Sequence, residues 1–166
     1  MPKLLVARFS EDSISQFRAA ARVRNDDAWR LASAGRGAAA IYLWGHVAEM
    51  LLKAAWFSLI GYRPDRAIRL VDLRKAIEAA RNECGFTWAG NFHNISHWAR
   101  LLVQHRIGLG RGYSAPVFGL EVQHHSQRVY DRWREVLRYK KNRAYAFEVN
   151  AVARSTEWFL SNSSQL

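Results

Sequence analysis

The chain has 166 residues, of which 49% are hydrophobic and 13% aromatic, so it can bury a full apolar core as one domain and is not intrinsically disordered. Its single cysteine, Cys84, excludes an internal disulfide. The net charge of +11 favours polyanionic partners such as nucleic acid, nucleotides or an anionic membrane surface. The alternative is that this charge serves only solubility.

No segment has the pattern of a targeting signal or a membrane span. The apolar run within residues 1–10 is too short for a signal peptide. The most apolar stretch, residues 37–60, carries His46, Glu49 and Lys53 near its middle. Charged side chains are costly in lipid, so we expect a buried helix here rather than a membrane helix. We therefore expect a cytoplasmic protein.

Helical periodicity runs through nearly every segment, and no convincing period-two alternation occurs, so the sequence predicts an all-α fold. Ser10 is the expected N-cap of a first helix that runs to about residue 33, where Gly35 and Gly37 break it. A second helix over about residues 38–60 is apolar nearly all round, which is typical of the central helix of a bundle.

Four further segments complete the predicted bundle. A short third helix ends near Gly85, and a fourth covers residues 91–106 before a glycine-rich loop. Pro116 begins a fifth helix, which we expect to bend or break at residues 140–142. Apolar stripes mark the third, fifth and last helices: Leu70, Leu73, Ile77 and Ala80; Phe118, Val122, Val129, Trp133 and Val136; Tyr145, Val149, Val152 and Phe159. Short connections favour an antiparallel up-and-down helical bundle of five to six helices.

Three segments, in this order, resemble the HEPN family (higher-eukaryote and prokaryote nucleotide-binding domains). The first, AIYLWGHVAEMLLKAA at residues 40–55, is similar to the family's long second helix with its Ala-x-Glu-x-x-x-Lys core, here centred on Glu49 and Lys53. The second, FHNISHWARLLV at residues 92–103, resembles its His-polar-Leu segment followed by a Leu pair. The third, residues 136–161, is similar to its Arg-Tyr element and final Ala-rich helix.

The resemblance implies a single HEPN-like helical domain over residues 1–166, frequently dimeric, that handles nucleotides or RNA. The family includes ribonuclease toxins and inactive modules that accompany nucleotidyltransferases. Its enzymatic members carry an Arg followed, after four to six residues, by a His near the Arg-Tyr element, but no such His follows Arg138. We therefore predict a non-catalytic homodimeric module that binds nucleotide, RNA or a partner protein, such as a nucleotidyltransferase or the other component of a toxin–antitoxin pair.

Two alternatives remain open. Arg100 and His105 have the family's spacing in a different helix, and they define a metal-independent ribonuclease in which His105 acts as general acid or base and Arg100 stabilises phosphate charge. Five residues apart on an ideal helix, they point about 140° apart, so a shared site would require them to meet across a dimer seam. A structural role for His105 is the alternative. The second alternative is a helical protein-interaction module that binds no nucleic acid.

The strongest charge cluster is the predicted site for RNA or nucleotide phosphate. Arg128 and Arg132, and likewise Arg134 and Arg138, are four residues apart and predict two adjacent ridges on one helix. Tyr139 and Tyr145 interleave with this cluster and are able to stack on bases. A solvated surface at a helix joint is the alternative. The members of this basic segment are Arg128, Arg132, Arg134, Arg138, Lys140, Lys141 and Arg143.

Histidines give a second set of candidates. His93 and His97 are expected on a polar face of the fourth helix, where they contact phosphate when charged. They lack the intervening Glu of a metalloprotease motif and a third ligand, so the sequence predicts neither a metal site nor a cofactor. His46 is predicted as a satisfied core histidine, and Glu49 with Lys53 as a structural pair.

Overall fold

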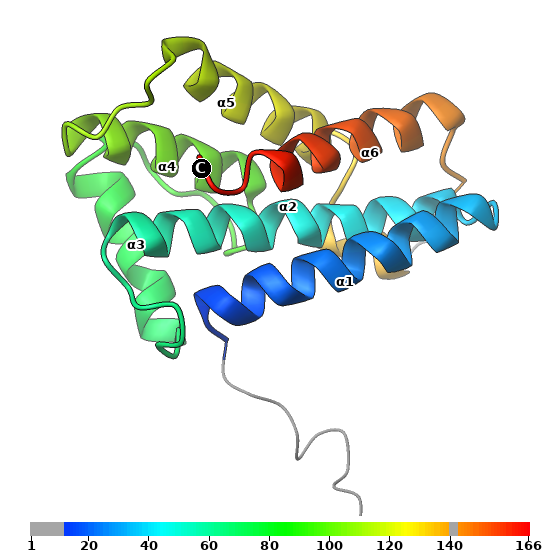
Figure 1. Cartoon of the computed structure of the whole chain (residues 1–166), viewed down its shortest axis with the longest axis horizontal. Coiled ribbons are helices and arrows are strands. Elements are labelled where there is room, and N and C mark those ends of the chain that lie inside the picture. Colours follow the sequence, from blue (N-terminus) through cyan, green and yellow to red (C-terminus); the bar gives the residue numbers. More distant parts are fainter. Residues whose placement is uncertain (1–11, 140–142) are drawn as a thin grey trace, which may run out of the picture.

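The computed structural model describes residues 12–139 and 143–166, and in these ranges it contains six α-helices, one short 3-10 helix and no strand. The prediction of an all-α bundle of five to six helices is confirmed (Figure 1). The elements are α1 (Ile14–Ser33), α2 (Gly37–Leu59), α3 (Leu70–Asn82), α4 (Ile95–Gly108), α5 (Pro116–Tyr130), the 3-10 helix η2 (Glu135–Tyr139) and α6 (Ala146–Ser161).

Helices α1 and α2 form an antiparallel hairpin, in which they lie side by side along their length (Figure 1). Ser13 caps α1 by accepting a hydrogen bond from the backbone N–H of Gln16 at 3.2 Å. The expected cap, Ser10, lies outside the described residues. Gly35 turns the chain between the two helices with a φ of 74°, a conformation that glycine adopts without a Cβ clash.

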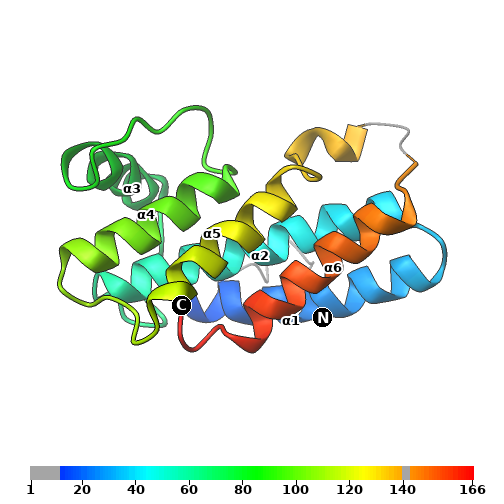
Figure 2. The same cartoon turned by 90° about the horizontal axis from the view of Figure 1, so that it is seen from above.

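Helix α2 is the central helix, as its apolar sequence predicts. It contacts α1, α4, α5 and α6, and Figure 2 shows it beneath α5 and α6. Trp44, Leu52 and Phe57 on α2 are fully buried, and each side chain of this kind stabilises the fold by about 1.5–3 kcal/mol when removed from water. One hydrophobic core draws residues from all six helices. None of the helices in the described ranges has the length and apolarity needed to cross a membrane.

Helix α3 buries most of the predicted stripe but not its first residue. Ala80 is buried, and Leu73 and Ile77 pack against the core, whereas Leu70 is 55% exposed. The polar Asp72 is buried at the start of the helix instead. Its carboxylate accepts hydrogen bonds from the Tyr62 hydroxyl at 2.7 Å and from the backbone N–H of Arg69 at 3.0 Å. A carboxylate that caps the first turn and bonds a tyrosine fixes the rotation of so short a helix.

The prediction that α5 continues past Trp133 toward residues 140–142 is wrong, because α5 ends at Tyr130. The fully buried Trp133 explains the early end. Its indole Nε1 donates to the backbone oxygen of Tyr42 at 3.0 Å. The ring lies flat against Gly45, where a Cβ would overlap it. Docking this large side chain on the backbone of α2 outweighs the continuing helical period of the sequence.

Helix α4 begins later than expected, at Ile95 rather than at residue 91. Asn94 is the N-cap, and its side chain accepts from the backbone N–H of His97 at 3.1 Å. His93 therefore precedes the helix, and the predicted polar face that joins His93 to His97 along one helix does not form. The expected start of α5 at Pro116 is confirmed.

Candidate functional site

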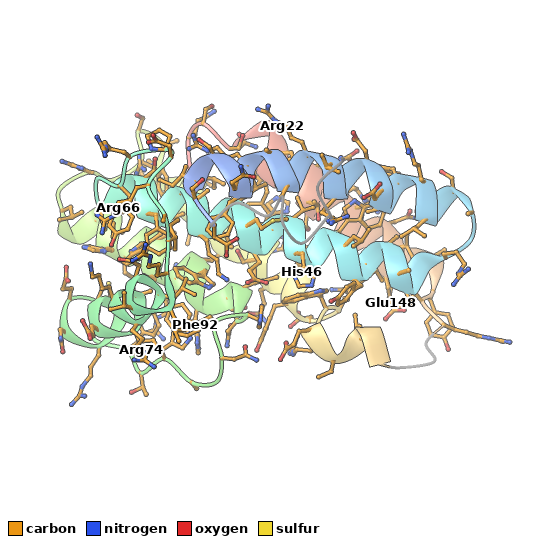
Figure 3. All side chains as sticks on the ribbon, turned by 90° about the horizontal axis from the view of Figure 1, so that it is seen from below. Arg22, His46, Arg66, Arg74, Phe92 and Glu148 are labelled. Carbon is orange, nitrogen blue, oxygen red and sulfur yellow. The ribbon has the colours of Figure 1, made fainter. Side chains whose placement is uncertain are left out.

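A partly buried polar cluster lies on the side of α2 that faces η2 and the loop before α4. We define it as His46, Glu49, Lys53 and His93, of which Glu49 and Lys53 are buried. Figure 3 shows His46 on this side of α2. Lys53 Nζ donates to Glu49 Oε1 at 2.5 Å, which confirms the predicted pair. His93 Nδ1 lies 3.0 Å from both carboxylate oxygens of Glu49. His46 Nδ1 lies 3.4 Å from Glu49 Oε2.

The electrostatics of this cluster are dominated by the buried carboxylate. Burial alone would raise the pKa of Glu49, but hydrogen bonds with His46 and His93 and the charge of Lys53 hold it well below its usual range. The hydrogen bond with Glu49 in turn raises the pKa of His93 against the opposing effect of burial. Glu49 is therefore ionised at neutral pH, with three basic side chains around it.

The cluster has defined walls. The rings of Tyr42 and Trp133 meet the His46 ring edge-on, with centroids 4.7 Å and 5.2 Å away. Asn91 Nδ2 donates to Glu135 Oε1 at 2.6 Å, which ties the loop before α4 to η2. His46 is not enclosed by these neighbours, because 27% of its side chain is exposed. The prediction of a fully satisfied core histidine therefore holds only in part.

His97 belongs to a separate aromatic environment. Its ring packs against those of Phe86 and Trp88, at centroid distances of 5.8 Å and 5.3 Å. Burial, assisted by the charge of Arg100, lowers the pKa of His97. Its Nδ1 atom is buried and has no hydrogen-bond partner. The structure therefore does not bring His93 and His97 together as a phosphate-contacting pair.

Arg100 and His105 also point to different surroundings. The Arg100 guanidinium lies 4.4 Å from the centroid of the Phe86 ring, and its Nε donates to Gln104 Oε1 at 3.3 Å. His105 is buried; its Nδ1 accepts from Trp56 Nε1 at 3.1 Å, and its Nε2 lies 2.9 Å from a Glu83 carboxylate oxygen. Both nitrogens of His105 are thus occupied, and no contact within the described chain joins it to Arg100.

His105 lines a cavity of about 680 Å³ between α2, α3 and the end of α4. Apolar atoms of Trp56 and Leu59 form part of its wall. Charges of both signs also line it, including Lys75 and Glu78. With no preponderance of one sign, the cavity does not have the character of a phosphate site.

The basic segment is more irregular than the two helical ridges that the spacing predicts, because only Arg128 lies on α5. Arg132 Nη1 donates back to the Arg128 oxygen at 3.0 Å. The guanidinium of Arg134 lies 3.6 Å from the centroid of the Tyr130 ring, and Arg143 is exposed. None of these four arginines makes an ion pair with a described carboxylate. Lys140, Lys141 and the side chains of Arg138 and Tyr139 lie outside what the structure describes.

An exposed aromatic pair follows the basic segment. The rings of Tyr145 and Phe147 stack at a centroid distance of 5.9 Å and an interplanar angle of 9°, with 68% and 64% of the two residues exposed. Figure 2 places the start of α6, where this pair lies, and η2 at the same end of the bundle. Tyr145 is predicted from the sequence as a stacking residue, whereas Phe147 is missed because its helical position alone does not show that it is exposed.

Comparison with known proteins gives no family assignment: no protein-family model matches the chain, and no curated protein or solved structure matches it. The HEPN resemblance therefore remains a prediction from three segments of sequence. The first of these segments lies on α2, and it contributes Glu49 and Lys53 to the polar cluster defined above. The third spans η2 and the whole of α6.

Proposed function

We propose that this chain is a non-catalytic module that binds RNA or nucleotide phosphates through the basic segment and the Tyr145–Phe147 pair. The observation that carries the proposal is the combination of arginines that pair with no carboxylate among the described residues and two stacked, exposed rings two positions apart on the chain. A basic groove with aromatic platforms is the common design of single-strand binding surfaces. The HEPN resemblance adds the expectation of a homodimer.

The arginines supply the electrostatic part of this binding. Arg134 and Arg143 are exposed and Arg128 is partly exposed. The Arg134 guanidinium is held over the Tyr130 ring, and its Nη1 donates to the Trp133 backbone oxygen at 2.6 Å, which leaves its other N–H groups for phosphate oxygens. Because these contacts are made to the backbone of the nucleic acid, we expect little sequence preference and a strong dependence on salt.

The aromatic pair supplies the second part. Two large rings on the surface leave apolar area in contact with water, and stacking a base on them removes that area without demanding a particular base. The separation of Arg100 from His105, and the occupied nitrogens of His105, support binding without cleavage. The ribonuclease and the protein-interaction module are the alternatives that the experiment separates.

The test is fluorescence anisotropy with a labelled single-stranded RNA and with a labelled ATP analogue, across a series of salt concentrations. Replacing Arg128, Arg134 and Arg143 together by Ala should reduce the slope of log K against log salt by about 2, since each phosphate contact to a single strand contributes about 0.7. A matched variant with Arg22, Arg74 and Arg81 replaced by Ala removes the same charge from exposed positions on α1 and α3. It should retain most of the affinity.

A second variant separates stacking from charge. Tyr145→Leu with Phe147→Leu keeps apolar volume and removes the rings, so RNA affinity should fall by about tenfold with little change in the salt slope. The proposed surface is contradicted if the Arg22/Arg74/Arg81 control loses as much RNA affinity as the Arg128/Arg134/Arg143 variant does. RNA integrity is followed in the same samples by gel electrophoresis. If the RNA is cleaved and His105→Ala abolishes the cleavage, the ribonuclease is favoured. If neither RNA nor the ATP analogue binds, the protein-interaction module is favoured.

A further inference from the structure

We propose that His46, Glu49 and His93 form a binding site for one divalent transition-metal ion, with Zn²⁺ as the best match. The three residues meet although His93 is far from the other two in the sequence. One ligand atom from each lies within 4.8 Å of the others. Neither RNA binding nor the HEPN resemblance enters this inference, so the two proposals stand or fail separately.

The two distances from the Glu49 carboxylate to the histidine nitrogens are close to those around a tetrahedral ion. Ligand atoms bound to Zn²⁺ at 2.0–2.1 Å are about 3.3 Å apart in a tetrahedral site. Glu49 Oε2 lies 3.0 Å from His93 Nδ1 and 3.4 Å from His46 Nδ1. Donor atoms of the two histidines lie within 4.8 Å of each other, so binding one ion requires the histidine rings to rotate around the Glu49 carboxylate.

The donor set selects the kind of metal. Two imidazole nitrogens and one carboxylate oxygen suit Zn²⁺ and its transition-metal neighbours, whereas Mg²⁺ and Ca²⁺ prefer oxygen ligands. Glu49 is ionised, as a ligand carboxylate must be, and the two histidines approach it with the same ring nitrogen, Nδ1. Each histidine must present an unprotonated Nδ1 to the ion, so a proton held on His93 Nδ1 would leave for solvent from an imidazolium, or move to Nε2 in a neutral ring.

Lys53 shapes the site without occupying its ligand positions. Its ammonium donates to Glu49 Oε1. Glu49 Oε2, which faces the imidazole of His46, is therefore left to bind the metal. A donor on the far oxygen of a ligand carboxylate fixes the orientation of that carboxylate. The positive charge also lowers the affinity for a dication, so we expect a weaker site than three unopposed ligands would make.

The site has an entrance and an open coordination position. The exposed fractions of the His46 and His93 side chains, 27% and 42%, provide a path from solvent, while Glu49 is buried beneath them. A water molecule would complete the tetrahedron. Because His46 and Glu49 belong to α2 and His93 to the loop before α4, the bound ion would clamp that loop to the central helix and stabilise the fold.

The experiment is calorimetric titration of the tag-free, EDTA-treated full chain with ZnCl₂. The wild type should bind one Zn²⁺ per chain. The variants His46→Ala and His93→Ala should each lose at least about 100-fold in affinity, which exceeds most changes in outer-shell residues. His124→Ala is the matched control, because His124 is exposed on α5 and outside the cluster, and it should bind as the wild type does. An excess of Mg²⁺ should not compete.

A second variant guards against loss of the fold. His93→Gln retains a donor for Glu49 but offers zinc a weak ligand, and circular dichroism should show wild-type helicity. Zinc should raise the thermal midpoint of the wild type and of His124→Ala but not of His93→Gln. The proposal is overturned if the wild type takes up no zinc, if folded His93→Gln binds it as tightly as the wild type, or if His124→Ala loses it.

Discussion

Two of the histidine–carboxylate pairs at α2, His93 with Glu49 and His105 with Glu83, are opposites in burial. In the first, the Glu49 side chain is 5% exposed and that of His93 is 42% exposed. In the second, the His105 side chain is 8% exposed and that of Glu83 is 55% exposed. The two ion-pair distances are nearly equal, 3.0 Å and 2.9 Å. The two pairs therefore differ not in distance but in which partner is buried: the carboxylate in the first pair and the histidine in the second.

A buried carboxylate has to be compensated, because an isolated charge away from water is costly. Glu49 accordingly gathers Lys53, His46 and His93, and this gathering produces a site with several donors. The buried imidazole of His105 needs only hydrogen-bond partners, which Trp56 and Glu83 supply. Several charged groups and potential ligand atoms thus surround Glu49. The contacts of His105 instead connect α4 to Trp56 on α2 and to Glu83 at the end of α3.

The largest expected effect comes from removing the charge that compensates Glu49. Lys53→Met leaves a buried carboxylate without its ammonium partner and should lower the free energy of unfolding by about 3 kcal/mol. Urea denaturation measures this change. Arg22→Met, at an exposed site on α1, is the control and should change little. The double variant Glu49→Gln with Lys53→Met should recover much of the lost stability. If Lys53→Met changes stability no more than the control does, the compensation of Glu49 by Lys53 is contradicted.

A smaller effect is expected at the second pair. Trp56→Phe keeps an aromatic ring but removes the N–H group that bonds His105 Nδ1, and the unsatisfied buried acceptor should cost about 1–3 kcal/mol. Glu83→Gln serves as the comparison. Because its side chain is 55% exposed, it should cost clearly less in the same urea experiment. The reverse order would mean that the surface carboxylate, not the buried contact, holds His105.

A histidine without any carboxylate sharpens the comparison, and at pH 7 its replacement should have the smallest effect of the three. His125 stacks on Trp158 and lies near Ser155 Oγ, and burial, assisted by the charges of His124 and Arg128, lowers its pKa to about 4. In the unfolded chain an ordinary histidine has a pKa of about 6.5. Between these values the unfolded state binds more protons, so stability should fall as the pH falls from about 6.5 to about 4.

The measurement compares urea midpoints at pH 7 and pH 5 for the wild type and for His125→Gln. The wild type should lose more stability over this interval than the variant does. The pKa of His97 is also lowered and acts in the same direction, so a residual slope is expected in the variant. Equal slopes for both proteins would show that His125 is protonated in the fold as easily as in the unfolded chain.

The sequence carries much of the fold because local signals specify it. The apolar α2, the break at Gly35 and the start of α5 at Pro116 follow from periodicity, glycine and proline. The end of α5 does not, because it depends on where the Trp133 indole meets α2. Such a contact between segments far apart in the chain has no signature in either segment alone.

The candidate sites divide in the same way. The pairing of Glu49 with Lys53 follows from their spacing. The spacing of His46 and Glu49, three residues apart on one face of α2, also indicates that they meet. The third member, His93, could not be placed from the sequence, because it joins the other two only through the loop that precedes the Asn94 cap.

Gly45 determines how substitutions would affect the surface that carries Arg134 and η2. A single hydrogen at this position lets the Trp133 indole lie on α2, and the path of the chain through Arg134 and η2 follows from that contact. Replacing Arg134 by lysine would keep the positive charge but lose the planar guanidinium that stacks on Tyr130. Any side chain at position 45 would instead displace the indole and, with it, the entire wall that carries Arg134. A residue with no side chain therefore decides where the neighbouring tryptophan and its segment lie.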